Sequence, residues 1–128
     1  MTARSRKERG RATERIVAQY LAEHGWPYAE PVGAGRPGSD ITGTPGIDWE
    51  IKARRGFEPR AAMKQQAERA KDGVVPVAVL RMDGDGPASI GDWPAVLPLS
   101  VLVSLLHDAA YGTRPKKPTT PMETKGQE

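Results

Sequence analysis

A run of seven residues with no charged or hydrogen-bonding side chain, Val-Val-Pro-Val-Ala-Val-Leu, occupies positions 74–80. Such a run is typical of a strand that is covered on both faces, whereas a half-exposed strand alternates apolar and polar residues. It is far shorter than the ~20 apolar residues that cross a membrane. The sequence therefore predicts an α/β protein with this strand at the centre of its sheet.

The remaining elements are predicted from periodicity and turn residues. Apolar residues at 16, 17, 20 and 21 form the stripe of an amphipathic helix over residues 5–24. Further helices are expected over 59–71 and 99–111, and further strands over 26–32, 39–42, 47–54 and 93–97. The predicted fold is one mixed β-sheet flanked by helices, with an α-β-β-β-α-β core and a C-terminal helix.

We expect a single domain over residues 1–112 and a disordered tail over 113–128, where Pro, Thr and Lys dominate. The C-terminal helix is expected to turn one apolar face into the core, or to use it as a dimer seam if its outer face is also apolar. The inward residues would be Leu102, Leu105, Leu106 and Ala109.

Composition excludes several classes of site. The chain has no cysteine, which excludes disulfides, thiol catalysis and Cys-ligated zinc, and its two histidines are too few for a three-histidine metal site. No apolar run resembles a signal peptide or a membrane span, so a cytoplasmic, soluble protein without membrane contact is expected.

The net charge of +3 hides an uneven distribution. Residues 1–15 carry six basic and two acidic side chains, and residues 52–71 carry seven and two. Residues 16–51 between them carry one basic and five acidic side chains. Two basic segments around an acidic one suit a surface that binds a polyanion and holds a cation within it.

The strand predicted over 47–54 carries the candidate chemistry. Alternate residues of a strand share a face, so Asp48, Glu50 and Lys52 point one way while Ile47, Trp49 and Ile51 point into the core. A solvated edge would explain these charges equally well from this strand alone. Asp40 favours a functional site over a solvated edge, because the short connection 42–46 suggests that strands 39–42 and 47–54 are antiparallel neighbours.

Asp40 would then lie beside Glu50, and carboxylates that close repel each other unless a cation lies between them. Hard oxygen ligands favour Mg²⁺, for which Mn²⁺ is expected to substitute. Lys52 would lie one pleat from Glu50, at about 6–7 Å. It could hold or help to deprotonate a water molecule and offset charge on a phosphate.

Asp40 followed by Glu50-Ile51-Lys52 resembles the signature of the PD-(D/E)XK nucleases. The surroundings resemble the archaeal-type Holliday junction resolvases of that superfamily, including phage versions. The similar features are a basic first helix with Gly10-Arg-Ala-Thr-Glu14, a Gly-rich loop at 33–39, a basic turn after the lysine and a helix with Gln65 and Gln66. The resemblance covers residues 5–82, and its one departure is Ser39, where the signature has proline.

The resemblance implies a restriction-endonuclease-like fold and a role for each matching position. Asp40, Glu50, the main-chain carbonyl of Ile51 and Glu14 would bind metal, and Lys52 would be the catalytic lysine. Gln66, or else Gln65, would lie near the scissile phosphate. The residues expected to contact the DNA backbone are Arg4, Arg6, Lys7, Arg9, Arg11, Arg36, Arg54, Arg55 and Arg60.

Plainer interpretations exist for several of these residues. Glu14 could form a surface ion pair with Arg11 or Arg15, the basic side chains could form solvated faces, and Asp48 competes with its neighbours for the metal. The glycines of Gly33–Gly38 match G-x-G-x-x-G, but a strand follows them where a dinucleotide site needs a helix. No nucleotide cofactor is therefore expected.

The predicted function is that of a Mg²⁺-dependent endonuclease that resolves four-way DNA junctions. A junction has two strands to cut symmetrically, so a homodimer with two active sites is expected. Two alternatives remain open from the sequence. One is a flap, nicking or restriction-type nuclease of the same superfamily, and the other is a non-catalytic nucleic-acid-binding protein of the same fold.

Overall fold

The structure is a computed structural model that describes residues 3–33, 36–53 and 58–113, with the side chains of 3–6 left out. The chain forms two compact units, Met1–Pro98 and Leu99–Glu128, and each is described by itself. The prediction of one domain over residues 1–112 stays a prediction. The tail predicted to be disordered lies, from residue 114 on, outside the described residues.

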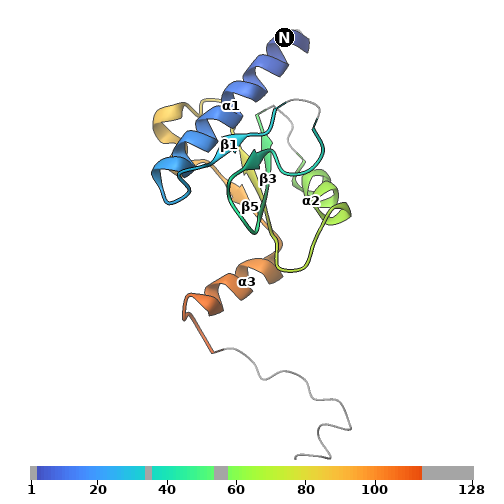
Figure 1. Cartoon of the computed structure of the whole chain (residues 1–128), viewed down its shortest axis with the longest axis vertical. Helices are drawn as coiled ribbons and strands as arrows, with labels where there is room; N and C mark the ends of the chain where they lie inside the picture. Colours follow the sequence, from blue (N-terminus) through green and yellow to red (C-terminus); the bar gives the residue numbers. More distant parts are fainter. Residues whose placement is uncertain (1–2, 34–35, 54–57, 114–128) are drawn as a thin grey trace, which may run out of the picture. The chain divides into compact units, whose positions relative to one another are not determined.

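The first unit has the predicted mixed α/β character (Figure 1). Helix α1 spans Ala3–Glu23, and strands β1 (Glu30–Pro31), β2 (Ile41–Thr42) and β3 (Ile47–Lys52) follow. Helix α2 (Pro59–Glu68) leads to β4 (Val75–Leu80), the 3₁₀ helix η1 (Pro87–Asp92) and β5 (Ala95–Val96). Up to Leu80 this order is the predicted α-β-β-β-α-β.

Strand β4 lies at the centre of a three-stranded sheet, as its apolar run predicts. It pairs in parallel with β3 and antiparallel with β5, in the order β3-β4-β5. Pro76 costs this strand no hydrogen bond to β3, because the neighbouring Val75 is the residue that donates to Gly46, at 2.8 Å. The peptide N–H that proline lacks would point to the opposite edge, where β5 pairs only from Ala78 onward.

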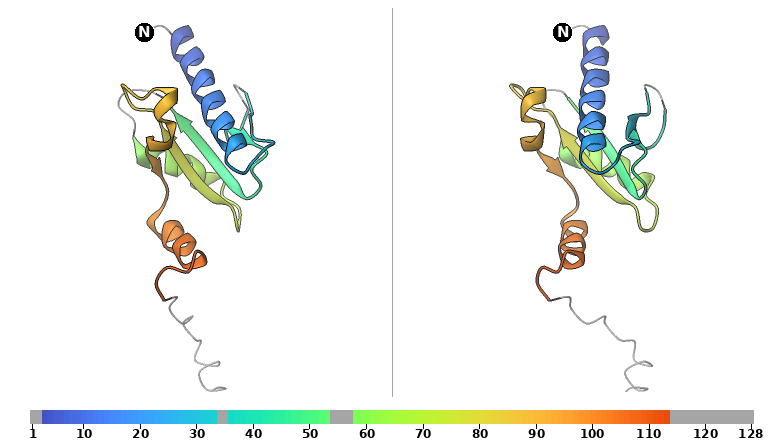
Figure 2. Two further views of the ribbon diagram at one scale, coloured as in Figure 1. Left: turned by 90° about the vertical axis from the view of Figure 1, so that its left-hand side faces the viewer. Right: turned by 60° about the vertical axis from the view of Figure 1, so that its left-hand side comes forward.

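The two helices cover opposite faces of the sheet (Figure 2). On the α1 face, Val17 and Leu21 pack with Trp49 and Ile51 of β3 and with Trp93 in the main core cluster. On the α2 face lie the polar residues of β3. The alternation of strand 47–54 therefore predicts both faces correctly, although the strand ends at Lys52.

The prediction of one sheet with strands 39–42 and 47–54 as antiparallel neighbours is wrong. β2 pairs with β1 in a separate two-stranded sheet. Gly43 and Gly46 take φ values of 82° and 83°, and the turn they make leads the chain away from a β2–β3 ladder. One backbone hydrogen bond joins the two segments, from the Asp40 amide to the Trp49 carbonyl, at 2.8 Å.

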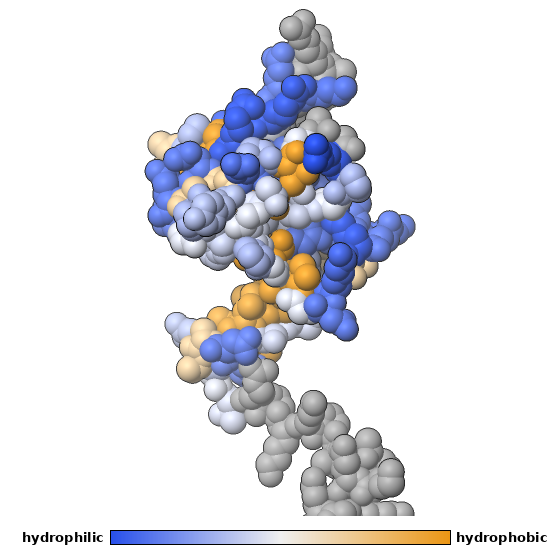
Figure 3. All heavy atoms as spheres, in the orientation of Figure 1, coloured by the Kyte–Doolittle hydropathy of each residue, from blue (hydrophilic) through white to orange (hydrophobic). Residues whose placement is uncertain are grey.

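The second unit contains α3 (Leu99–Asp108), which has no buried residue. Leu102, Leu105 and Leu106 are exposed, as is Ala109. Their predicted burial against the core, or in a dimer seam, stays a prediction. Figure 3 shows the apolar side chains of this helix at the surface. The helix is apolar on several sides, so its sequence alone does not select one face for burial. Within the described residues, no helix is both long and apolar enough to cross a membrane.

Candidate active site

The charged side chains of β3 meet on the α2 face of the sheet. Lys52 Nζ lies 3.1 Å from Glu50 Oε2, and the two side chains are 22% and 9% exposed. Glu50 and Asp48 are both buried residues. Buried carboxylates are costly unless they are paired and hydrogen-bonded, so this face is built around charge pairs rather than around solvent.

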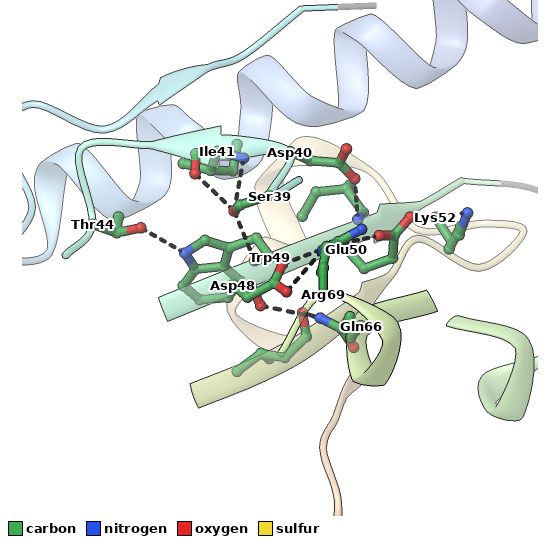
Figure 4. A network of polar contacts seen from close by, with 12 residues as sticks. Ser39, Asp40, Ile41, Thr44, Asp48, Trp49, Glu50, Lys52, Gln66 and Arg69 are labelled. Carbon is green, nitrogen blue, oxygen red and sulfur yellow. Dashed lines mark hydrogen bonds and ion pairs between the residues drawn. The ribbon is translucent and has the colours of Figure 1, made fainter. Parts of the chain in front are cut away.

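Asp40 is fixed to the edge of β3 by its side chain (Figure 4). The Ile51 amide donates to Asp40 Oδ2 at 2.7 Å. In a parallel pair the N–H and C=O of one residue point to the same side, and Lys52 uses its carbonyl on the β4 side to accept from Arg81. The Ile51 carbonyl therefore points to the same edge as Asp40, and its role as a metal ligand stays a prediction.

Ser39 explains how this edge is held without a β2–β3 ladder. Its Oγ accepts from the Trp49 amide at 2.9 Å and donates to the Ile41 carbonyl at 2.8 Å. A proline could make neither bond. The departure from the signature at this position thus has a structural use, because Ser39 ties the segment that carries Asp40 to β3.

Arg69, directly after α2, completes the cluster and was not predicted. Its Nε and Nη2 donate to the two Asp48 oxygens at 2.9 and 2.7 Å, and Nη2 also donates to Glu50 Oε1 at 2.8 Å. The pKa of Arg69 is raised, chiefly by the hydrogen bond to Asp48. Asp48, the competing metal ligand from the sequence, therefore has both oxygens bound to Arg69.

Two other carboxyl groups are affected by the negative charge at this edge. Burial raises the pKa of Glu14 on α1, and the charges of Asp40 and Glu50 raise it further, against a smaller opposing effect of Arg11. Burial also raises the pKa of Asp40; the Ile51 amide opposes this, and the charge of Glu50 adds to it. Glu14, Asp40 and Glu50 therefore repel one another, which a bound cation would relieve.

We expect Glu14→Gln to stabilise the metal-free protein at neutral pH. A carboxyl whose folded pKa is raised destabilises the fold when ionised, and the penalty disappears as pH falls through the raised value towards that of the unfolded chain, about 4.5. The variant should therefore resist urea better than the wild type at pH 7.5, and its advantage should be much smaller at pH 4.5, in a chelator. Glu23→Gln, which removes an exposed carboxylate from the same helix, is the control; equal stability at both pH values would contradict the prediction.

The oxygen atoms near Asp40 could bind Mg²⁺ if water molecules filled its remaining coordination positions. Within the described part of the chain, no three His, Cys, Asp or Glu side chains form a group that could hold a metal ion by themselves. Asp40 and the Ile51 carbonyl offer oxygen atoms at the edge of β3, and the Glu50 carboxylate on the α2 face interacts electrostatically with Asp40. Mg²⁺ commonly binds through one or two carboxylates while keeping several waters. Glu14 interacts electrostatically with this edge, and its role as a ligand stays a prediction.

Gln66 is held inside the protein. It is 2% exposed, and its Nε2 donates to the carbonyls of Asp48 and Val77, both at 3.1 Å. These bonds attach α2 to two neighbouring strands and use both hydrogens of the amide. The geometry gives Gln66 a structural role, while Gln65 is exposed. A place for either residue beside a phosphate stays a prediction.

The basic residues predicted to contact DNA have different surroundings. Arg9 is partly buried, and its Nε donates to the Ala53 carbonyl at 2.9 Å, which ties α1 to the end of β3. The side chains of Arg4 and Arg6, and all of Arg54 and Arg55, lie outside the described residues. The exposed members of the set are Lys7, Arg11, Arg36 and Arg60.

Comparisons with protein-family models, with curated proteins and with solved structures gave no match.

Proposed function

We propose that the chain is a Mg²⁺-dependent endonuclease of the PD-(D/E)XK type that acts on branched DNA, with four-way junctions as its first substrate. One observation carries the proposal. Lys52 Nζ lies 3.1 Å from Glu50 Oε2, next to the strand edge where Asp40 is fixed at the Ile51 amide. Two carboxylates that can hold a metal ion and a lysine beside them are a set of side chains that can support phosphodiester hydrolysis by a water molecule.

Lys52 and the carboxylates have separate tasks in such a reaction. When bound, Mg²⁺ would supply an acidified water and neutralise charge on the phosphate. Asp40 and Glu50 would hold the cation, and the Ile51 carbonyl would add a neutral oxygen. The Lys52 ammonium orients the attacking water and stabilises the negative charge that builds up on phosphorus-bound oxygens as the new P–O bond forms and the old one breaks.

The basic residues favour a nucleic acid over a small phosphate ester. Lys7 and Arg11 are exposed on α1, and Arg60 is exposed at the start of α2. Contacts of this kind recognise the charge and shape of the nucleic-acid backbone and do not distinguish one base sequence from another. A substrate chosen by its shape, such as a junction, suits that mode of binding. Symmetric cleavage of a junction calls for two copies of the chain.

A cleavage assay tests the function. The full chain is incubated at one salt concentration with a four-way junction, a flap, a nicked duplex and a linear duplex of matched sequence, with Mg²⁺ or with a chelator. We expect the junction to be cut only with Mg²⁺ and faster than the other substrates. Preferred cutting of a flap, nick or linear duplex would support a different nuclease of this superfamily. Binding without any cutting would favour a non-catalytic protein.

A further inference from the structure

Arg69 lies in a position from which it can reach two strand residues at once. It caps the C-terminal end of α2, with φ −114° and ψ 14°, and its side chain extends across the polar face of β3. Figure 4 shows the guanidinium between the carboxylates of Asp48 and Glu50. These carboxylates lie two residues apart on one strand face, so a single planar fork spans both of them.

The contacts differ between the two carboxylates. Asp48 gives both oxygens to Arg69, at 2.9 and 2.7 Å, and is 8% exposed. Glu50 divides its oxygens, with Oε1 at 2.8 Å from Arg69 Nη2 and Oε2 at 3.1 Å from Lys52 Nζ. A carboxylate held at both oxygens has lost its freedom to rotate. Asp48 thus anchors the arginine, and the arginine holds Glu50.

The Arg69–Glu50 contact is more than charge neutralisation requires. Asp48 alone balances the charge of Arg69, and Lys52 alone balances that of Glu50. The shared Nη2 nevertheless joins these two pairs into one network, which sets the plane of the Glu50 carboxylate at the edge where Asp40 lies. Groups that orient a metal-binding carboxylate in this way commonly change metal affinity or activity by roughly 10–100-fold when they are removed.

We propose that Arg69, anchored by Asp48, is a positioning residue that sets the orientation of Glu50 for binding a divalent cation. This rests on the proposed function, in which Glu50 is a metal ligand. Arg69 acts through Glu50 and touches no reacting atom. Its removal should therefore weaken cation binding even when no DNA is present.

The test measures Mn²⁺ binding to the full chain by titration calorimetry without DNA. We expect Arg69→Gln to raise the dissociation constant roughly 10–100-fold. Asp48→Asn should weaken binding less, because Arg69 keeps its bond to Glu50. The double variant Asp48→Asn/Arg69→Gln should bind no more weakly than Arg69→Gln, since Asp48 acts through the arginine. Lys71→Gln, which removes an exposed charge just beyond α2, is the matched control and should bind like the wild type.

Two further variants keep the test decisive if Arg69→Gln does not fold. Arg69→Lys keeps the positive charge but cannot span both carboxylates. The double variant Asp48→Asn/Arg69→Gln removes one acidic and one basic group, so the charges that remain, on Glu50 and Lys52, still balance. Mn²⁺ binding equal to the wild type in both variants, or additive losses in the double variant, would overturn the inference alone. A wild-type chain that neither binds Mn²⁺ nor cuts DNA would overturn the proposed function with it.

Discussion

Lys52→Ala is expected to lower the rate of junction cleavage at least ~100-fold, the usual cost of removing one group that stabilises a developing oxyanion. Its ammonium lies 3.1 Å from Glu50 Oε2 and stays 22% exposed, so it can reach both the carboxylate and an incoming phosphate. Binding of the junction should change little, because the exposed basic residues lie on other elements. Cleavage is measured in single turnover with saturating enzyme, and binding separately with a chelator.

Matched variants distinguish a loss of catalysis from the effect of removing a positive charge and from a loss of folding. Lys64→Ala removes an exposed lysine from α2 and should cut at the wild-type rate. Asp40→Ala and Glu50→Ala should abolish cleavage in the same assay. All four proteins should show the same tryptophan fluorescence, because Trp49 lies on the strand that carries Lys52. Wild-type cleavage by Lys52→Ala would refute the assignment.

The features that the sequence predicts well depend on neighbours in the chain. Alternation over 47–52 places Glu50 and Lys52 on one face of β3, and the structure confirms this shared face. The ion pair between their side chains, at 3.1 Å, is closer than the predicted spacing of one pleat. The apolar run at 74–80 predicts the central strand from composition, because a strand covered on both faces is apolar throughout. Both patterns involve only residues of one strand, so neither depends on contacts with distant parts of the chain.

The features that the sequence missed depend on contacts between distant residues. Arg69 meets Glu50 across a separation of nineteen residues, and no periodicity links a helix end to a strand face. Asp48, Glu50 and Lys52 on one face did signal that a buried partner was needed, since two acids face one lysine. Arg69 belongs to the basic segment 52–71, so it was among the residues that could have been considered as this partner. The separate β1–β2 sheet was missed because side-chain bonds of Ser39 and Asp40 replace the expected ladder.

Gly43→Ala is expected to destabilise the first unit by about 2–6 kcal/mol. Gly43 has φ 82°, and a Cβ there would overlap the Tyr28 carbonyl oxygen, which belongs to the backbone and cannot swing aside. Strain of a side chain in this region costs about 1–3 kcal/mol, and overpacking adds a similar amount. Urea unfolding followed by tryptophan fluorescence measures the loss, because all three tryptophans lie in the first unit.

Gly46→Ala separates the two causes. Gly46 has nearly the same φ, 83°, but a Cβ there meets nothing within 4 Å, so only the strain of about 1–3 kcal/mol should remain. Equal losses in the two variants would mean that the approach of Gly43 to Tyr28 does not contribute to stability.

If this approach does contribute, Gly43→Ala should also weaken Mn²⁺ binding more than Gly46→Ala. The contact with Tyr28 fixes the start of the turn that separates Asp40 from β3, and moving that turn displaces the carboxylate from the Ile51 amide.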